Sequence, residues 1–303
     1  MSLSSFDDLF RLADQLTQPV PVAVAGGADD TVLEALREAV ERGWVAPALA
    51  GPEADVRRLA AERGIDLRGF RLVDTEEPAP AAVAEVRQGR AALLMKGQIA
   101  TPALMKAVLD PAFGLRTGGT ICQIVLMEIG PTNRRFLLAD TGLCIQPTLE
   151  QKADILRGTV AVARQLEAAE PRVAVLAATE SPTDAMPETL EAAELQRRQQ
   201  AGEFPGCRVR GPLSFDLAYA EEAAARKRLH DPDFGAADVM LFPNLLAANL
   251  TVKAIMYTAD CRFGGILWGA SCPVVFMSRA DSSATRLRSL ALALRCGSFS
   301  KRG

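Results

Sequence analysis

Short apolar runs alternate with longer amphipathic stretches along almost the whole chain. The amphipathic stretches predict helices, as in residues 29–43, where apolar side chains recur on one face until Gly43 ends the pattern. Strands that alternate with helices in this way predict an α/β fold with mainly parallel sheets and helices on both faces. The candidate strands are residues 20–26, 46–51, 70–74, 91–97, 121–129, 135–140, 172–178, 207–211, 238–244, 264–269 and 272–278.

The chain is long enough for two domains. It has 303 residues, of which 49% are hydrophobic, so it can bury a large core. The alternation of strands and helices changes near the middle of the chain. A strand ends at Asp140, Pro147 interrupts the regular structure, and a long helical stretch precedes the strand at Arg172. We therefore place a domain boundary at residue 147, and expect ligands in a cleft beyond the carboxyl ends of the strands.

Charge and hydropathy argue against nucleic acid and membranes as partners. The formal net charge is −3 with acids and bases interspersed, so the chain lacks a broad basic surface. No apolar stretch approaches the roughly 20 residues of a membrane span. The start "MSLSSFDDLFRLADQL" is acidic and amphipathic, unlike an export signal. We expect a cytoplasmic protein whose partners are small molecules or copies of itself.

The cysteine and histidine content and the absence of familiar motifs argue against further classes of metal site and enzyme. The six cysteines are scattered without C-x-x-C spacing, which favours small buried hydrophobes. His230 is the single histidine, so zinc sites built on several histidines of one chain are impossible, and its polar surroundings predict a solvated loop. The sequence also lacks the P-loop, the G-x-G-x-x-G fingerprint and the G-x-S-x-G elbow.

Polar residues repeatedly occupy the points where apolar strands end. In a doubly wound sheet these strand ends converge on one edge, so the side chains there are candidates for a ligand site. The next helix in each case begins close by, and Thr101 is the expected N-cap before Pro102. The strand-end residues are Lys96, Gly97, Asp140, Thr141, Thr179, Glu180, Ser278, Arg279 and Asp281.

Some of these residues have a purely structural alternative. Thr101, Asp281 and Ser282 could simply cap helices, which requires no ligand. Lys96 and Arg279 are harder to explain in that way, because a cation directly after a buried run requires an anion. Arg279 beside a helix N-terminus suits phosphate, since free backbone N–H groups and a planar guanidinium both bind its oxygens.

The chain resembles the phosphate acetyl/butyryltransferase family, and most closely its phosphate butyryltransferase branch. Ordered blocks carry the resemblance from about residue 90 to 295, and ordered blocks over most of a chain rarely arise by chance. They are "LLMKGQIATPALMKAVLD", "GLRTGG", "ADTGLCIQPTLEQKADIL", "MPETLEAAELQRRQQAGEFPGCRVRGPLSFDLAYAEEAAARK", "ADVMLFPNLLAANLTVKAI" and "CPVVFMSRADSSATRLRSLALA".

The resemblance implies a fold and a reaction. It implies two α/β domains around a cleft, similar to the isocitrate/isopropylmalate dehydrogenases, with residues 1–147 completed by 271–303 and a second domain at 148–270. It also implies the reversible conversion of acyl-CoA and phosphate to acyl phosphate and CoA by direct attack of phosphate on the thioester. Acyl-CoA would be a substrate, with no bound cofactor or metal, and the chain would form a homodimer or a higher homo-oligomer.

The family blocks also imply roles for individual residues. Arg279 would hold phosphate, and Ser278 would bond phosphate or the thiol sulfur. Asp281 would either hold Arg279 or handle the thiol proton, and these two roles stay open. Arg116 would be a second basic residue, although a solvated loop arginine is the alternative. The remaining substrate-binding positions are Lys96, Gly97, Thr101, Asp140, Thr141, Asn249, Lys253 and Ser282.

The sequence departs from the family pattern at a few positions, and other readings stay open. Ala248 replaces a glycine, Arg286 stands where lysine is common, and Ala284 and Thr285 occupy a region where acetyl-specific members have an aspartate. Related folds serve acyl-carrier-protein phosphate acyltransferases and decarboxylating dehydrogenases, but the latter need a cluster of metal-binding aspartates that the sequence lacks. Another alternative is a catalytically degenerate paralogue that binds acyl-CoA or phosphorylated ligands as a regulatory or scaffold subunit.

Overall fold

The computed structural model describes residues 3–297, which form two compact units. The N/C unit contains residues 6–121 and 263–297, and the middle unit contains residues 3–5 and 122–262. These divisions differ from the expected boundaries at residues 147 and 270. The last two strands before residue 147, β5 (Cys122–Ile129) and β6 (Arg134–Ala139), pair with each other, and β6 also pairs with the later strand β9 (Val239–Leu241). The last six residues of the expected first domain, 298–303, lie outside the described residues.

The strands of the N/C unit lie in the order β3-β2-β1-β4-β11-β10. Neighbours from β3 to β11 are parallel, and β10 is antiparallel to β11. The register pairs Ala25 of β1 with Lys96 of β4, so the carboxyl ends of these two strands are level. The strands are β1 (Val20–Ala25), β2 (Val45–Gly51), β3 (Arg71–Asp74), β4 (Leu93–Lys96), β10 (Cys261–Trp268) and β11 (Val274–Val275).

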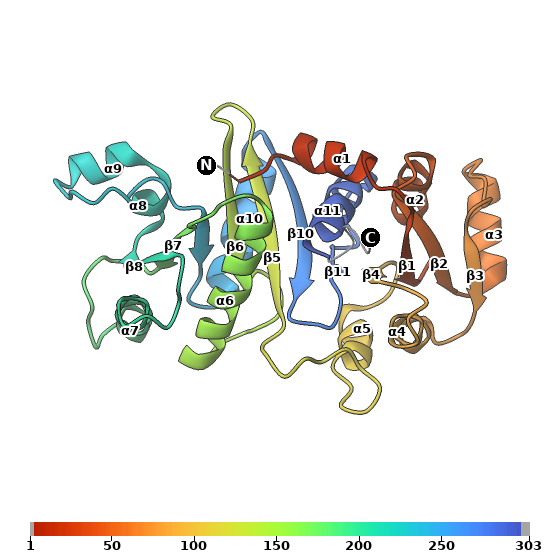
Figure 1. Cartoon of the computed structure of the whole chain (residues 1–303), viewed down its shortest axis with the longest axis horizontal. Coiled ribbons are helices and arrows are strands. Elements are labelled where there is room, and N and C mark those ends of the chain that lie inside the picture. The colour runs from red at the N-terminus through yellow and green to blue at the C-terminus, as the bar shows by residue number, and fades with distance from the viewer. Residues whose placement is uncertain (1–2, 298–303) are drawn as a thin grey trace. The chain divides into compact units, whose positions relative to one another are not determined.

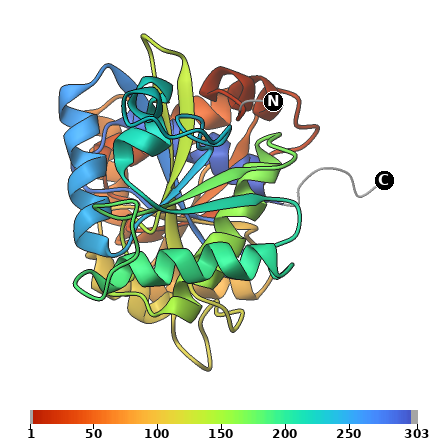
Figure 2. The same ribbon diagram turned by 90° about the vertical axis from the view of Figure 1, so that its left-hand side faces the viewer.

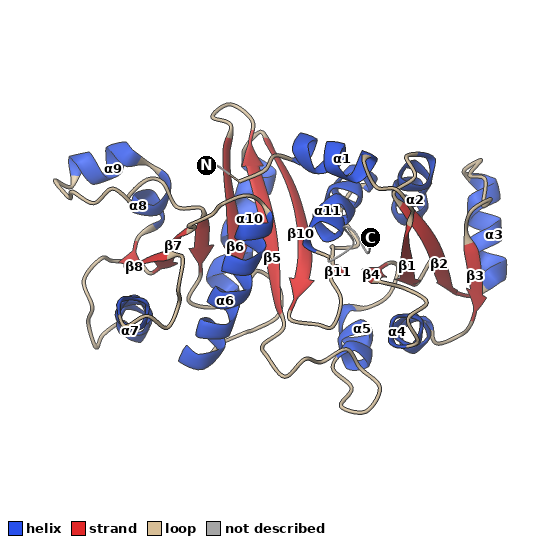
Figure 3. Cartoon of the chain, in the orientation of Figure 1, coloured by secondary structure: helices blue, strands red, loops and turns tan. Residues whose placement is uncertain are grey.

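Helices cover both faces of the N/C-unit strands. Figures 1 and 3 show α1, α2 and α11 on one face, and α4 and α5 on the other. Contacts agree, because α11 packs against α1, α2 and β11, whereas α4 packs against β1, β2 and α5. The helices are α1 (Phe6–Asp14), α2 (Asp30–Glu41), α3 (Glu53–Glu62), α4 (Pro78–Arg87), α5 (Thr101–Val108) and α11 (Ser283–Cys296).

Polar caps fix the starts of two helices near the strand ends. Asp29 caps α2 by accepting the Val32 backbone N–H, and Ser282 caps α11 by accepting that of Thr285. The expected cap of α5 is wrong by one residue. Ala100 has the extended backbone of the cap position and offers no side-chain acceptor, so Thr101 is the first helical residue. The helix starts one residue early because Pro102 fits the first turn at either of its first two positions.

The strands of the middle unit lie in the order β5-β6-β9-β7-β8. β5 and β6 are antiparallel, and β6, β9, β7 and β8 are parallel neighbours. The interiors of β5, β6 and β9 are almost continuously buried, as expected for strands covered on both faces. The strands are β5 (Cys122–Ile129), β6 (Arg134–Ala139), β7 (Arg172–Leu176), β8 (Arg208–Leu213) and β9 (Val239–Leu241).

Middle-unit helices pack against these strands. Contacts place α6 against β6 and β9, and α7 against β7 and β8. Figure 2 shows α10 in light blue along the left edge of the view and α7 in green below the strands. A capping box between Thr148 and Gln151 begins α6. The helices are α6 (Leu149–Gln165), α7 (Pro187–Gln200), α8 (Phe215–Tyr219), α9 (Glu221–Arg226) and α10 (Leu245–Thr258).

The predicted fold class is confirmed. Every apolar run named as a candidate strand overlaps a strand of the structure, and mostly parallel strands alternate with helices in both units. The candidate strands at residues 264–269 and 272–278 form the antiparallel pair β10 and β11. Over residues 3–297, no helix is both long and apolar enough to cross a membrane.

Candidate active site

Lys96 ends β4 inside the N/C unit, and its side chain is almost completely enclosed. Its exposed fraction is 2%. The next residue must be glycine, because a Cβ on Gly97 would lie 2.0 Å from the carbonyl oxygen of Gly26, which follows β1. The chain segments after β1 and β4 therefore pass in direct backbone contact. This contact places the Lys96 ammonium at the carboxyl edge of the parallel strands.

The Lys96 ammonium lies in an environment with an excess of positive charge. Burial lowers its pKa most, followed by the charges of Arg286 and Arg279, while Asp29 and Asp281 act in the opposite direction. Its Nζ atom donates a long bond of 3.4 Å to the Gly97 carbonyl. Within residues 3–297, no carboxylate lies within 4.0 Å of this nitrogen. Lys96 is thus a buried cation without a direct ion-pair partner in the described chain.

Arg286 of α11 lies beside Lys96 and has no exposed surface. Its guanidinium donates to the Thr31 hydroxyl at 2.7 Å, the Ser278 carbonyl at 3.2 Å and the Lys96 carbonyl at 3.4 Å. The nearest Asp29 carboxylate oxygen is 3.9 Å away. The sequence showed Arg286 only as a departure from the family pattern. A recognisable signal was its position four residues before buried Leu290 of the same helix, which places both on the inward face.

The turn after β11 holds Ser278, Arg279 and Asp281. The Ser278 backbone N–H donates to the Asp281 carboxylate at 2.7 Å, and the Ala280 N–H donates to the Ser278 hydroxyl at 3.3 Å. Arg279 is exposed between them and acts electrostatically on Lys96. The structure therefore brings the catalytic candidates together with Lys96 and Gly97. Ser282, the next residue, caps α11.

The other two N/C-unit candidates lie differently. Thr101 is exposed in the first turn of α5, five residues after Lys96. Arg116 is exposed and its backbone bridges Ala270, in the loop that leads into β11. Because β11 runs parallel to β4, the backbone of Arg116 lies at the opposite strand edge from Lys96. The structure therefore does not bring Arg116 to the Lys96 cluster, and the solvated loop arginine describes it better.

In the middle unit, two candidates follow β6 and two lie on α10. The buried Asp140 carboxylate accepts the backbone N–H groups of Gln123, Gly142, Leu143 and Cys144, so its contacts organise the loop that follows. Thr141 is linked to α10, because the Asn249 amide donates to its carbonyl at 3.3 Å. Lys253 is exposed one turn further along α10.

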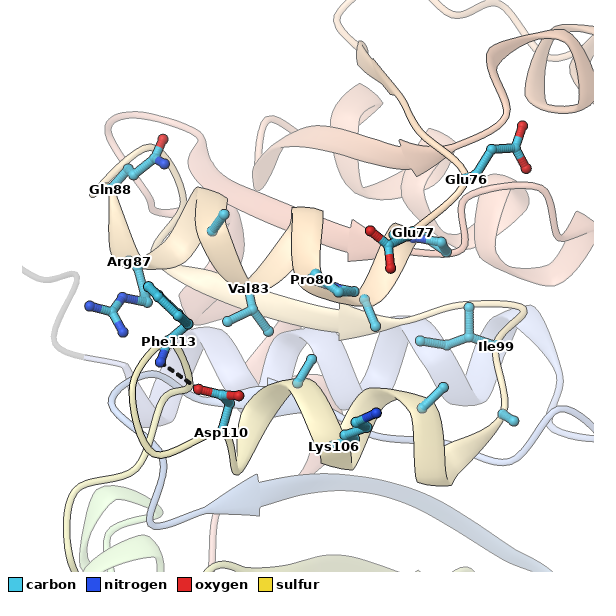
Figure 4. Close-up of a pocket in the computed structure, with 16 residues that line it drawn as sticks. Glu76, Glu77, Pro80, Val83, Arg87, Gln88, Ile99, Lys106, Asp110 and Phe113 are labelled. Atoms are coloured by element: carbon cyan, nitrogen blue, oxygen red, sulfur yellow. Dashed lines mark hydrogen bonds between the residues drawn. The ribbon is translucent and has the colours of Figure 1, made fainter.

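A groove runs between α4 and α5 on one face of the N/C unit. Its volume is ≈ 980 Å³ and small apolar side chains of both helices line most of it. Figure 4 shows Ile99 at the end next to Glu76 and Glu77, Lys106 along α5, and Arg87 beside Phe113 at the far end. Ile99, at one end of the groove, follows Lys96 by three residues in the chain.

Comparisons with known proteins show which family the chain belongs to. A family model described as phosphate acetyl/butaryl transferase matches residues 76–294. A phosphate acetyltransferase from Thermotoga maritima is 39% identical over 89% of this chain and 93% of its own length. The chain belongs to the phosphate acetyl/butyryltransferase family.

The relatives of this family member include both acetyltransferases and butyryltransferases. A phosphate butyryltransferase from Clostridium acetobutylicum is 38% identical over 90% of this chain and 91% of its own length. A crystal structure of a branched-chain phosphotransacylase from Enterococcus faecalis V583 has a TM-score of 0.79 and 28% identity over 91% of this chain and 98% of its own. The fold is also similar to that of a 4-hydroxythreonine-4-phosphate dehydrogenase from Burkholderia phymatum, with a TM-score of 0.52, 15% identity and coverage of 92% of this chain and 98% of its own.

The thiols of this family member are mostly packed within the fold. Cys122, Cys207, Cys272 and Cys296 are buried, and burial raises the pKa of Cys272 and of Cys296 to about 12. These four fit the expected small hydrophobes. Among the residues that the structure describes, no group of three or more His, Cys, Asp or Glu side chains is placed to hold a metal ion.

Proposed function

We propose that this family member transfers a short-chain acyl group between coenzyme A and inorganic phosphate: acyl-CoA and phosphate give acyl phosphate and CoA. The buried Lys96 ammonium beside Arg286 and Arg279 is the observation that supports phosphate as a substrate. Burying an uncompensated cation is costly, so such a cluster is built for an anion supplied from outside the chain. A phosphate dianion supplies that charge and matches the planar guanidinium of Arg279.

The proposed chemistry needs no covalent enzyme intermediate. A phosphate oxygen attacks the thioester carbonyl carbon, the C–S bond breaks, and the sulfur leaves as a thiolate that takes up a proton. Lys96 and Arg279 hold the phosphate close to the carbonyl and offset its charge, and the Ser278 hydroxyl bonds phosphate or the sulfur. Asp281 positions the turn, because its carboxylate already accepts the Ser278 N–H at 2.7 Å.

The groove between α4 and α5 suits the coenzyme. Its ≈ 980 Å³ is at the upper end of the range for ligand pockets, which is about 300–1,000 Å³. We place the CoA phosphates near Lys106 and Arg87, the pantetheine arm along Val83 and Ala103, and the thioester toward Ile99. In this orientation the CoA phosphates lie near basic side chains, and the pantetheine arm lies along the apolar side chains of the groove.

A bulky side chain in the groove tests that placement. Ala103→Trp should raise the KM for acyl-CoA about 10-fold or more, the equivalent of ~1.4 kcal/mol, and leave the KM for phosphate unchanged. The matched control is Ala61→Trp on α3, an exposed alanine outside the groove lining. An unchanged acyl-CoA KM in Ala103→Trp would move the coenzyme elsewhere.

The middle-unit candidates form a separate part of the proposal. Thr141 and Asn249 are joined by a hydrogen bond, and Lys253 lies on the same side of α10 as Asn249, four residues on. We assign these three to substrate binding. Asp140 contributes by holding the loop that carries Thr141, through its bonds to the N–H groups of residues 142–144.

We further propose a cytoplasmic homo-oligomer that associates through one face of α10. Leu246, Leu250 and Tyr257 are 70%, 60% and 80% exposed and recur at helical spacing on this face. Exposed Ile145 lies next to them, since the Leu245 N–H donates to its carbonyl. Exposed apolar side chains grouped in this way, with Lys253 on the same face, are typical of a protein interface, and a second copy presents the same face.

The decisive experiment is a thiol-release assay with acetyl-, propionyl-, butyryl- and isobutyryl-CoA, each with and without phosphate. We expect phosphate-dependent release of CoA with at least one of them, and the ranking identifies the acyl preference. Measurable CoA binding without release from any acyl-CoA would instead support the catalytically degenerate paralogue.

A further inference from the structure

Arg286 is fully enclosed, so it is not placed to touch a ligand. Its exposed fraction is 0%, and its N–H groups are used within the protein. They bind three segments that are far apart in sequence: Thr31 at the start of α2, Lys96 at the end of β4 and Ser278 after β11. Two of the acceptors are backbone carbonyls of residues that belong to the proposed phosphate site.

The geometry of the guanidinium matters more here than its charge. Nη1 donates to the Lys96 carbonyl at 3.4 Å and Nη2 to the Ser278 carbonyl at 3.2 Å. A planar group of fixed shape that binds two carbonyls fixes their separation, whereas a lysine ammonium on a flexible stem does not. The pairing of Met95 with Val275 sets the spacing of the two strands, and beyond it the guanidinium links the end of β4 to the Ser278 turn.

The charge of Arg286 is compensated through α2. The Thr31 hydroxyl, which accepts from Nε, donates to the Asp29 carboxylate at 2.6 Å, and Asp29 Oδ2 is 3.9 Å from Nη2. The same carboxylate caps α2 through the Val32 N–H at 3.0 Å. Asp29 thus lies within 4.0 Å of Arg286, whereas it acts on the Lys96 ammonium only from a greater distance.

We propose that Arg286 is a positioning residue of the phosphate site, which holds the backbones of Lys96 and Ser278 so that the Lys96 ammonium and Arg279 meet on one anion. This inference rests on the proposed function. Substitution of Arg286 should weaken phosphate binding more than coenzyme A binding. The two carbonyls that Arg286 holds belong to the segments that carry the phosphate-binding cations.

Arg286→Lys is the main test, because it keeps the positive charge and removes the planar guanidinium that binds both carbonyls. We expect the KM for phosphate to rise about 10-fold, the effect of losing roughly one to two hydrogen bonds, with the KM for acyl-CoA within about 2-fold of the parent. The matched control is Arg288→Lys on the same helix, since Arg288 is half-buried over the Phe6 ring and does not reach these carbonyls. Its phosphate KM should not change.

A pH profile separates positioning from simple stabilisation. Lys96 interacts with Arg286 from α11, Arg279 and Asp281 from the turn after β11, and Asp29 from the start of α2. Arg286→Met removes a charge that lowers the Lys96 pKa, so the alkaline loss of kcat/KM for phosphate should move to higher pH. In Arg286→Lys it should stay where it is in the parent, because the charge remains.

Phosphate binding gives a readout that does not need catalysis. Phosphate alone should raise the Tm of the parent, and Arg286→Lys should need about 10-fold more phosphate for the same rise. If the parent binds phosphate but releases no CoA, the proposed function fails while this inference is still tested. If Arg286→Lys does not fold, Thr31→Val removes the Nε acceptor and should weaken phosphate binding about 3-fold. Unchanged phosphate binding in the folded variant, or an equal loss in Arg288→Lys, would overturn the proposal.

Discussion

The Asp281 carboxylate accepts the backbone N–H of Ser278 at 2.7 Å and so closes the turn that presents Arg279. Because Arg279 is exposed and bears on Lys96 electrostatically, its side chain is available to an anion at the strand ends. Arg279→Lys should lower kcat/KM for phosphate by roughly 10²–10³-fold through loss of the bidentate contact, with CoA binding and Tm almost unchanged. Initial rates at subsaturating phosphate measure the effect.

Arg116→Lys is the matched control for Arg279→Lys. The substitution is chemically identical, but the Arg116 backbone bridges Ala270 at the opposite strand edge. Its turnover should equal that of the parent. Near-full turnover in Arg279→Lys would show that this arginine is structural. A loss of turnover in Arg116→Lys would show that Arg116 belongs to the active site.

Lys96→Met should make the protein more stable and less active. The buried ammonium has no carboxylate within 4.0 Å among residues 3–297, so an apolar chain of similar shape relieves its burial. We expect the free energy of unfolding in urea to rise by about 1–4 kcal/mol and phosphate turnover to be lost. A less stable variant would show that Lys96 is neutralised within the fold.

Activity and stability should respond to alkaline pH in opposite directions. Burial and the charges of Arg286 and Arg279 lower the Lys96 pKa from its ordinary 10.5. Between the lowered pKa and 10.5 the unfolded chain binds more protons than the folded chain, so stability from this group rises with pH. Phosphate turnover needs the ammonium and should fall over the same range. In urea titrations, Lys96→Met should lack this part of the pH slope.

Asp140→Asn should loosen the loop after β6. The carboxylate accepts four backbone N–H groups, and an amide keeps only one acceptor oxygen while turning a donor toward N–H groups. We expect a loss of about 1.5–3 kcal/mol in the free energy of unfolding. Asp154→Asn is the control, because its ion pair with Arg157 is largely exposed and contributes at most about 1 kcal/mol. Equal stability of both variants would contradict the loop-organising role.

Leu250→Glu should separate the subunits if α10 forms the interface. Leu250 is 60% exposed in the described chain, so the substitution does not disturb the core, but it places a charge in the proposed contact. Light scattering should show a smaller particle with an unchanged Tm of the monomer fold. Leu190→Glu on α7, where the leucine is 41% exposed, should leave the particle size unchanged.

The sequence was sufficient for the elements and for the strand-end chemistry. The β4 and β11 runs are apolar and end at Lys96 and Ser278, because a buried parallel strand is continuously hydrophobic and its carboxyl end faces the site. Alternating runs cannot show which strands pair. For that reason the expected boundary at residue 147 differs from the division after residue 121, and β5 and β6 lie between the two.

Side-chain contacts were harder to predict than strand ends. Arg286 and Arg116 are both arginines near polar segments, yet one is fully buried and the other exposed. The difference comes from tertiary packing of α11 against β11 and from the bridge of Arg116 to Ala270, and neither is encoded in local spacing. The many contacts of Asp140 likewise depend on the path of the loop after β6.

The N/C unit is assembled from the first and the last parts of the chain, with residues 122–262 made in between. During synthesis, β4 therefore leaves the ribosome long before β11, its partner from Val274 onward, and until then one edge of β4 has unpaired backbone groups. Arg286 arrives later still. A nascent chain can complete residues 122–262 while it still lacks the guanidinium and the Ser278 turn, so the proposed phosphate site forms only after the middle unit has been made.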